Sequence, residues 1–387
     1  MKNIYAFYIL LFFLSCKSDK SMDVSGIISI PVDINQSEPA LMSKHFESIE
    51  YILLDYDDSL PIARPTYIKF FEEDIFAQDR GLDNIIQFNR NGEVKRIFQS
   101  TGIGGPGEFM QVENFQVRED TLLISDARQN KILAFSHEGE HLFTEKSPYR
   151  LSDVFYTPNF QLYHLNNAPE SQDRSNFIRI SPDTTIGWYP IRTGYENYMF
   201  RTIHGFYTDP FSRDILFNVP LSYDVILFDY KGHFRKILQF DFKQGAISDD
   251  LRLRIKEIPN RNEFMKEQKL VEFLHCFFPF SDQYFLGFNR RGDGNYFIFL
   301  DKNFKIKSQI SRFVNDLDGM EIRNIPWTFT EDEIVYMIPS LDFYDDFKKS
   351  EDNILKIDAE APILDFVKRN KSRLEDDRYV LVVLKVK

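Results

Sequence analysis

Four basic side chains in two short segments are the residues of this sequence best suited to bind an anion. Arg201 and His204 lie three positions apart in one segment, and Arg290 and Arg291 are adjacent in another. A guanidinium group donates two parallel hydrogen bonds to a carboxylate, so converging arginines would hold a carboxylate or an acidic sugar. The alternative is a structural role for each side chain, and the sequence leaves both interpretations open.

Two polar loops and one glycine-rich loop supply further candidates. Asp79 and Asp126 each begin a polar stretch, and an arginine follows within two positions. Such aspartates bond backbone N–H groups in tight turns, which the repetition favours over metal binding. The loop Gly102–Phe109 lacks the Lys-Ser/Thr pair of a phosphate loop and is interpreted as a linking turn, with Glu108 as a salt-bridge or backbone partner. The candidate binding residues are Arg80, Glu108, Asp126, Arg128, Arg201, His204, Arg290 and Arg291.

Catalytic constellations are absent from the sequence. None of the seven His residues has the spacing to another His, Cys or acidic residue that helical metal ligands show. There is no Gly-x-Ser-x-Gly elbow, and Cys276 lies in the apolar run Leu274–Phe278, where a buried thiol would be inert. The sequence therefore predicts no cofactor and no resident metal, and it favours a non-catalytic protein.

The charge of the chain argues against one class of partner. The 47 basic and 59 acidic side chains give a net charge of −12 and are mixed along the chain, which argues against nucleic acid as a partner. The 39 Phe and 19 Tyr residues favour β structure. Cys16 and Cys276 are the only cysteines, and because Cys16 lies in a targeting segment we expect no disulfide.

The first sixteen residues are typical of an export signal. Lys2 precedes an apolar run, Ile4–Leu14, which has the length of a signal-peptide core and is too short to span a bilayer. The run ends in Phe-Leu-Ser-Cys16, which resembles a bacterial lipobox, although Phe13 departs from the usual Leu. This resemblance implies that residues 1–15 are removed and that Cys16 is lipidated. Residues 16–40 are then expected to be a flexible tether that anchors the protein at the outer membrane, facing the periplasm or the cell surface.

The rest of the chain contains a repeated sequence pattern. Asp79, Phe88 and Gly92 each recur 47 residues later, as Asp126, Phe135 and Gly139, within the same order of short β-like runs and hairpin turns. One degenerate copy, one clear copy near Gly232 and two copies with insertions follow. A repeat of this length with about four short strands is the size of a propeller blade. The sequence predicts an all-β fold, a six-bladed β-propeller over residues 41–387.

Two features complete the predicted ring. The segment Ile49–Leu54 is expected to pair with Val380–Val386 and so close it, which makes the last eight residues essential to stability. Helical insertions are predicted at Ser248–Gln268, between blades 4 and 5, and at Asp352–Arg373, within blade 6. The loops with most of the candidate residues would share one face with both insertions, so we expect recognition on that face.

A family resemblance emerges from these motifs. Ser125–Ile132 followed by Phe135 is similar to the core of NHL repeats, and Gly104–Phe109 resembles the turn that leads into each such blade. With the lipobox, this resembles the bacterial six-bladed β-propeller lipoproteins, which implies the fold more than a function. Some six-bladed relatives are lactonases or lyases with a channel metal, but this sequence shows no matching ligand set.

The favoured hypothesis is a monomeric, lipid-anchored, non-catalytic binding module for an envelope protein, peptide or glycan. One alternative is a metal-dependent hydrolase or lyase with its site at the mouth of the central channel. Another is a purely architectural ring that supports a larger envelope complex. The sequence does not identify the ligand.

Overall fold

The computed structural model describes residues 26–56, 62–99, 105, 107–171, 174–196, 200, 204–358 and 360–387. The predicted signal peptide, the lipidated Cys16 and the first part of the tether lie outside the described residues, as does Arg201. No helix among the described segments has the length and apolar character to cross a membrane.

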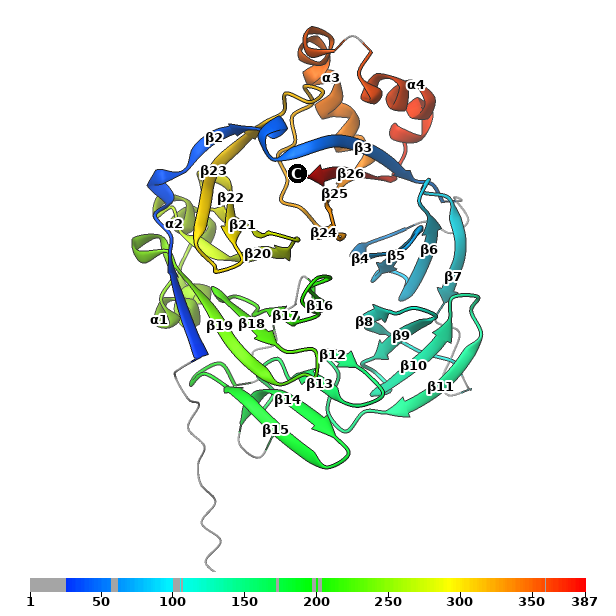
Figure 1. Cartoon of the computed structure of the whole chain (residues 1–387), viewed down its shortest axis with the longest axis vertical. Helices are drawn as coiled ribbons and strands as arrows, with labels where there is room; N and C mark the ends of the chain where they lie inside the picture. The colour runs from blue at the N-terminus through cyan, green and yellow to red at the C-terminus, as the bar shows by residue number, and fades with distance from the viewer. Residues whose placement is uncertain are drawn as a thin grey trace, which may run out of the picture.

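Six sheets stand side by side around a central axis, and each contributes its first strand to the centre (Figure 1). Within a blade the strands a, b, c and d run antiparallel from the axis outward. Blade 1 contains β4 (Pro65–Phe71), β5 (Asp74–Asp79), β6 (Asn84–Asn89) and β7 (Val94–Gln99). Blade 2 contains β8 (Val112–Val117), β9 (Thr121–Asp126), β10 (Lys131–Ser136) and β11 (His141–Lys146). Blade 3 contains β12 (Asp153–Tyr156), β13 (Gln161–His164), β14 (Ser175–Ser181) and β15 (Thr184–Pro190).

The other three blades each gain a strand from the N-terminal segment. Blade 4 contains β16 (Phe206–Thr208), β17 (Ile215–Asn218), β18 (Asp224–Phe228) and β19 (Phe234–Asp241). Blade 5 contains β20 (Val271–Pro279), β21 (Gln283–Arg290), β22 (Gly294–Asp301) and β23 (Ile306–Val314). Blade 6 contains β24 (Thr328–Phe329), β25 (Glu333–Pro339), β26 (Tyr379–Val386) and β3 (Phe46–Leu54). These sheets confirm the predicted six-bladed propeller.

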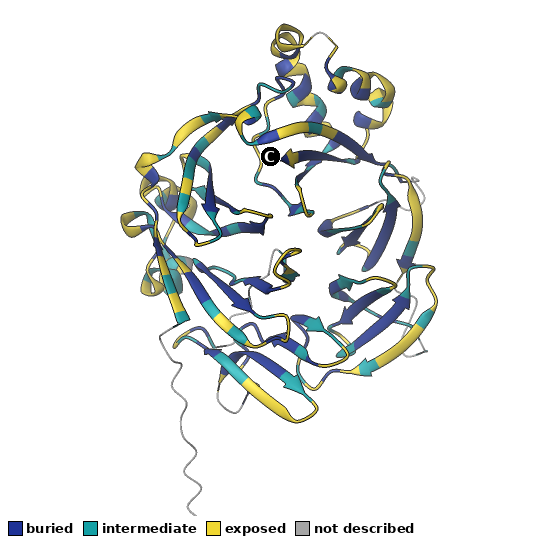
Figure 2. Ribbon diagram, viewed as in Figure 1, coloured by how far each residue is buried: buried dark blue, intermediate teal, exposed yellow. Residues whose placement is uncertain are grey.

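Alternating side chains in each strand fill the spaces between blades. In β26, Val380, Val382 and Leu384 pack toward blade 5, whereas Leu381 and Val383 pack toward blade 1. This period of two follows from the pleat of the strand. Because both faces of an inner strand are covered by neighbouring blades, its sequence is a continuous apolar run. The interior strands are accordingly buried on both faces, and exposure is concentrated at the outer strands and helices (Figure 2).

The ring closes as predicted. Strand β3 pairs antiparallel with β26, with Ile49 opposite Leu384 and Leu54 opposite Tyr379. An N-terminal strand thus completes the sheet that ends the chain, so that no blade is left with three strands. This closure removes the two open edges that an unclosed ring would have.

The prediction that residues 16–40 form a flexible tether is wrong for the described part. Strand β1 (Ile27–Pro31) pairs in parallel with β19, and β2 (Glu38–Leu41) pairs in parallel with β23. Pro31 and Pro39 obscured both strands in the sequence, yet proline is tolerated in an edge strand, where one side makes no ladder bonds. The segment covers the outer edges of blades 4 and 5 before it enters blade 6.

Helical insertions interrupt the ring at the two predicted places. Helices α1 (Asp249–Arg254) and α2 (Arg261–Glu267) lie between β19 and β20, and the Ser248 hydroxyl caps α1 by accepting a hydrogen bond from the Leu251 N–H. The second insertion is longer than predicted, because α3 (Ser340–Ile357) and α4 (Pro362–Leu374) fill the whole b–c connection of blade 6. Phe343 and Phe366 extend the core between blades 5 and 6 outward. Both insertions project from the rim of the ring (Figure 1).

Candidate functional site

The first strands of five blades line a cavity of about 260 Å³ in the central channel. Phe70, Val117, Pro210 and Glu331 lie where these strands lead into the a–b loops. The insertions belong to b–c and d–a connections, which emerge on the other face. The cavity therefore opens on the face opposite to the one on which the sequence analysis placed recognition. Its lining residues with polar groups are Tyr67, Lys69, Gln116, His204, Tyr207, Thr208, Trp327, Thr328, Thr330 and Glu331.

Among the described residues that line this cavity, Lys69 is the one that carries a positive charge at pH 7. Its ammonium group donates a hydrogen bond of 2.7 Å to the Phe115 carbonyl and lies 5.2 Å from the centre of the Phe115 ring. No carboxylate of the described residues lies within 4.0 Å of the Lys69 Nζ. Burial lowers the pKa of Lys69 to about 8, against the charge of Asp153, which raises it. Glu331 also lines the cavity, but it makes no ion pair with Lys69 within 4.0 Å. The ammonium group thus has no carboxylate in contact among the described residues, and an anionic group of a ligand would supply one.

His204, a predicted site residue, does reach this channel. Its Nε2 lies 2.9 Å from the His275 carbonyl oxygen and donates to it, and the ring meets Phe278 edge-on. Burial, the His275 charge and the Lys69 charge lower the pKa of His204 to about 4, against the hydrogen bond to His275, which raises it. The imidazole is therefore neutral near pH 7 and contributes shape and hydrogen bonding but no charge.

Aromatic side chains from blades 4, 5 and 6 form the wall beside these groups. The Phe329 ring stacks on Phe278 at 4.7 Å and meets Tyr207 edge-on at 5.6 Å. The Trp327 Nε1 donates a 3.0 Å hydrogen bond to the Thr66 carbonyl and so fixes its indole against blade 1. A rigid apolar wall beside one cation suits a ligand that carries both an apolar surface and a negative charge.

Buried polar contacts join the first strands of blades 2 and 3, and Gly205 of blade 4 packs against them. Asn114 Nδ2 donates to Asp153 Oδ1 at 2.7 Å, and His164 Nδ1 lies 3.4 Å from the other oxygen of Asp153. Gly205, with φ of +61°, passes so close that a Cβ there would lie 2.4 Å from Asn114 Nδ2. Only glycine combines this backbone conformation with this approach, so Gly205 sets the position of β16 and of His204 beside it.

Arg80 and Arg128 lie on the face of the ring that carries the helical insertions, and two side chains before and within blade 2 link them. Arg80 Nη2 is 3.3 Å from Glu113 Oε2, and Arg128 Nε donates to Gln111 Oε1 at 3.2 Å. The Gln111 amide in turn lies 3.5 Å from Glu113. The structure therefore brings these two predicted residues into one exposed network, but it does not bring them to the cavity.

Asp126 and Glu108 have backbone partners. The buried Asp126 carboxylate accepts from the N–H groups of Met110, Arg128 and Gln129 at 2.8 to 3.1 Å, which ties the d–a connection to the b–c loop. Glu108 Oε2 accepts from the Gly105 N–H at 2.7 Å. These contacts match the turn-capping and backbone-partner interpretations of both residues.

Arg290 and Arg291 do not line the cavity. Arg290 Nη1 pairs with Asp293 Oδ2 at 3.0 Å, and its Nε donates to the Lys269 carbonyl. Arg291 Nε donates to Glu272 Oε2 at 3.1 Å. The structure does not bring them together with His204, because each arginine has a partner on the adjoining α2–β20 segment, and of the two interpretations left open it favours a structural role for this pair.

Sequence reasoning missed Lys69, Tyr207 and Trp327. One signal was available, since Lys69 is the single charge in the apolar run Tyr67–Phe71 and faces the axis. Among the described residues, no three His, Cys, Asp or Glu side chains are grouped so that they could hold a metal ion.

The fold and its channel define a six-bladed propeller protein with a small central cavity. The chain belongs to the DUF5128 family, described as a 6-bladed beta-propeller, whose model matches residues 17–337. A search among curated proteins finds no match.

Two solved structures are similar to this chain to different degrees. A Bacteroides fragilis protein described as exported is 15% identical, with a TM-score of 0.66, and the match covers 93% of this chain and 99% of that one. A Bacteroides vulgatus member of the DUF4221 family is 12% identical over 88% of this chain and 97% of that one, with a TM-score of 0.45. The first likeness supports the fold, and the second is too distant to carry an argument.

Proposed function

We propose that the protein is an envelope-anchored, non-catalytic binding module that holds an anionic group of a peptide, protein or glycan ligand in its central channel. The observation that carries this proposal is Lys69, a half-buried ammonium group without a close carboxylate among the described residues. A buried charge that lacks a counterion costs stability, and a ligand carboxylate would compensate it. The aromatic wall would then contact the apolar part of the same ligand.

The anchoring part of the proposal rests on the N-terminal sequence. The apolar run and the Leu-Ser-Cys16 motif favour export and lipidation, and the similar Bacteroides fragilis protein is described as exported. Strand β1 begins at Ile27, so at most ten residues separate a lipidated Cys16 from the edge of blade 4. Such a short link would hold the ring close to the membrane.

Capture from intact cell envelopes tests the binding role. The lipidated protein is cross-linked to its neighbours, and the captured molecules are compared between the natural protein and Lys69→Met. We expect Lys69→Met to lose the specific ligand, because methionine fills the same volume without a charge. Lys131→Met is the matched control, since Lys131 also donates to a backbone carbonyl, that of Glu108, but lies away from the channel.

Two results separate function from folding. Lys69→Met should unfold at the same temperature as the natural protein or higher, because it removes an uncompensated charge from a half-buried position. Equal capture by the natural protein and by a folded Lys69→Met variant would contradict the proposed role of the channel. Capture lost equally in Lys131→Met would show that the charge of the ring as a whole, and not Lys69, determines binding.

A further inference from the structure

Glu331 adds a negative charge to the channel cavity that contains Lys69. It lies in the a–b loop of blade 6, two residues after the end of β24, and it lines the cavity. Its side chain is exposed and makes no hydrogen bond or ion pair with any described residue. A ligand with only negative charge would be repelled by this carboxylate. The cavity therefore favours a ligand that also carries a positive charge.

The two charges lie on neighbouring blades at similar depth. Strands β4 and β24 are adjacent near the axis (Figure 1), and the hydrogen bond of 3.0 Å from Trp327 Nε1 to the Thr66 carbonyl joins them. The first strands of all blades run in the same direction, because the blades repeat around one axis. Counted from this contact toward the a–b loops, Lys69 is three residues along and Glu331 is four. Glu331 therefore lies about one residue nearer the mouth, roughly 3 Å by the rise of a strand.

Apolar side chains surround these charges. Phe70, Phe155 and Phe329 come from blades 1, 3 and 6, line the cavity and are half-buried. Their accessible ring surface is available to an apolar group of a ligand. The volume of about 260 Å³ is just below the roughly 300–1,000 Å³ of sites for drug-sized molecules. The cavity therefore suits a small ligand better than an oligosaccharide.

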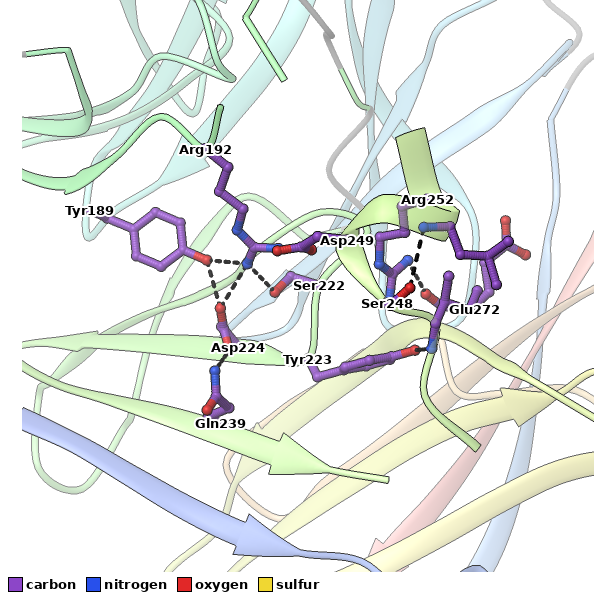
Figure 3. A network of polar contacts seen from close by, with 12 residues as sticks. Tyr189, Arg192, Ser222, Tyr223, Asp224, Gln239, Ser248, Asp249, Arg252 and Glu272 are labelled. Carbon is purple, nitrogen blue, oxygen red and sulfur yellow. Dashed lines mark hydrogen bonds and ion pairs between the residues drawn. The ribbon is translucent and has the colours of Figure 1, made fainter. Parts of the chain in front are cut away.

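A larger cavity of about 510 Å³, between blades 3 and 4, differs because its central cation is paired (Figure 3). Arg192 Nη2 donates to Tyr189 Oη at 2.7 Å, Ser222 Oγ at 2.9 Å and Asp224 Oδ2 at 3.0 Å. Its Nη1 donates to Asp249 Oδ1 at 2.9 Å. The charge of this guanidinium is thus neutralised within the protein, unlike the two charges of the channel.

We propose that the channel binds a zwitterion, either a free apolar amino acid or a short peptide that ends in an apolar residue. This inference rests on the proposed function, because the carboxylate of the ligand would contact Lys69, and it adds that the ammonium group would contact Glu331. The apolar side chain would pack on the three half-buried phenylalanines. An ion pair at each end fixes the orientation of the ligand, since the reversed ligand would bring like charges together.

Titration calorimetry with phenylalanine, Gly-Phe and Gly-Gly-Phe tests the proposal, because these probes differ in the distance between their two charges. Each probe is compared with its N-acetyl form, which lacks the ammonium group, and with its C-terminal amide, which lacks the carboxylate. We expect the best zwitterion to bind at least tenfold more tightly than its N-acetyl form, and its amide not to bind. Lys69→Met should lose binding of every probe that has a carboxylate.

Glu331→Gln separates this inference from the proposed function. The variant should bind the N-acetyl form at least as tightly as the natural protein does but lose the preference for the zwitterion, because only the partner of the ammonium group is removed. Glu331→Lys should reverse the preference. Asp332→Asn is the matched control and should keep it, since Asp332 is exposed, lies 3.7 Å from Lys385 and does not line the cavity. Circular dichroism checks that each variant is folded.

The two levels of the account fail in different ways. Equal binding of the zwitterions and their N-acetyl forms by the natural protein, with both lost in Lys69→Met, would overturn the zwitterion and leave the anion site intact. Tighter binding of galacturonate than of every zwitterion would also overturn it. Absence of binding of any carboxylate probe by the folded natural protein would overturn this inference and the proposed function together.

Discussion

Asp126 and Lys69 are both charged side chains inside the ring, and they differ in how the charge is compensated. The Asp126 carboxylate accepts three backbone N–H groups, so its charge is stabilised by the fold itself. The Lys69 ammonium group donates one hydrogen bond to a backbone carbonyl and lies over the face of one aromatic ring. A methionine or leucine at position 69 would destabilise the fold less than an uncompensated ammonium group does. The charge is therefore better explained by a role in binding.

The buried histidines make stability depend on pH. Burial lowers the pKa of His204 and of His275 to about 4, whereas both titrate near 6.5 when unfolded. The unfolded chain therefore binds more protons between these values, and the stability that neutral imidazoles allow is present above pH 6.5 and lost as the pH falls through 4. We expect the free energy of unfolding to fall from pH 7 to pH 4.5 by on the order of 2 kcal/mol per imidazole.

His204→Gln isolates one of these contributions, because glutamine keeps a donor for the His275 carbonyl and does not titrate. Denaturant unfolding at pH 7 and pH 4.5 should show roughly half the natural loss of stability in this variant. The same acid sensitivity in His204→Gln as in the natural protein would contradict the assignment.

At the scale of elements, strands that belong to a clear sequence repeat are predictable, whereas the short strands outside the repeat are not. Gly92, Gly139 and Gly232 were recognised as hairpin glycines, and each has a positive φ, of 86°, 90° and 76°. Strands β1 and β2 were missed, since four or five residues interrupted by proline carry little periodic signal. Their pairing depends on the free edges of blades 4 and 5, which are more than 200 residues away in sequence.

Removing residues 380–387 should abolish the folded ring. Strand β26 lies between β25 and β3, so this truncation breaks two ladders and removes the fully buried Val380, Val382 and Leu384 from the core between blades 5 and 6. Thermal unfolding followed by circular dichroism should show no cooperative transition. Removing residues 1–31 is the control, because β1 is an outer fifth strand and its loss should lower the melting temperature by only several degrees. Cooperative unfolding of the C-terminal truncation would contradict the role of β26.

At the scale of the whole molecule, the sequence was sufficient for the architecture and not for the site. Repeat spacing predicts the blades because the strands of one blade are close together in sequence. It also predicts closure, because the ring closes most simply when Ile49–Leu54 completes the sheet that ends in Val380–Val386. The cavity joins Lys69 of blade 1 with His204 of blade 4 and Trp327 of blade 6, which are adjacent only once the ring has closed. Arg290 and Arg291 were the more visible basic pair, but contacts within their own blade neutralise them.

Thermal shift of the purified protein with soluble carboxylates is the most direct test of the channel as an anion site. Galacturonate and N-acetylglutamate serve as probes, with galactose as the neutral control, at pH 7 and pH 9.5. We expect stabilisation by at least one carboxylate at pH 7, because bound ligand stabilises the folded state, and none by galactose at the same concentration. Since the pKa of Lys69 is about 8, the apparent affinity should fall roughly 30-fold at pH 9.5, and Lys69→Met should show no shift at either pH. Equal stabilisation of the natural protein and Lys69→Met, or no stabilisation by either carboxylate at pH 7, would contradict the assignment of the channel as an anion site.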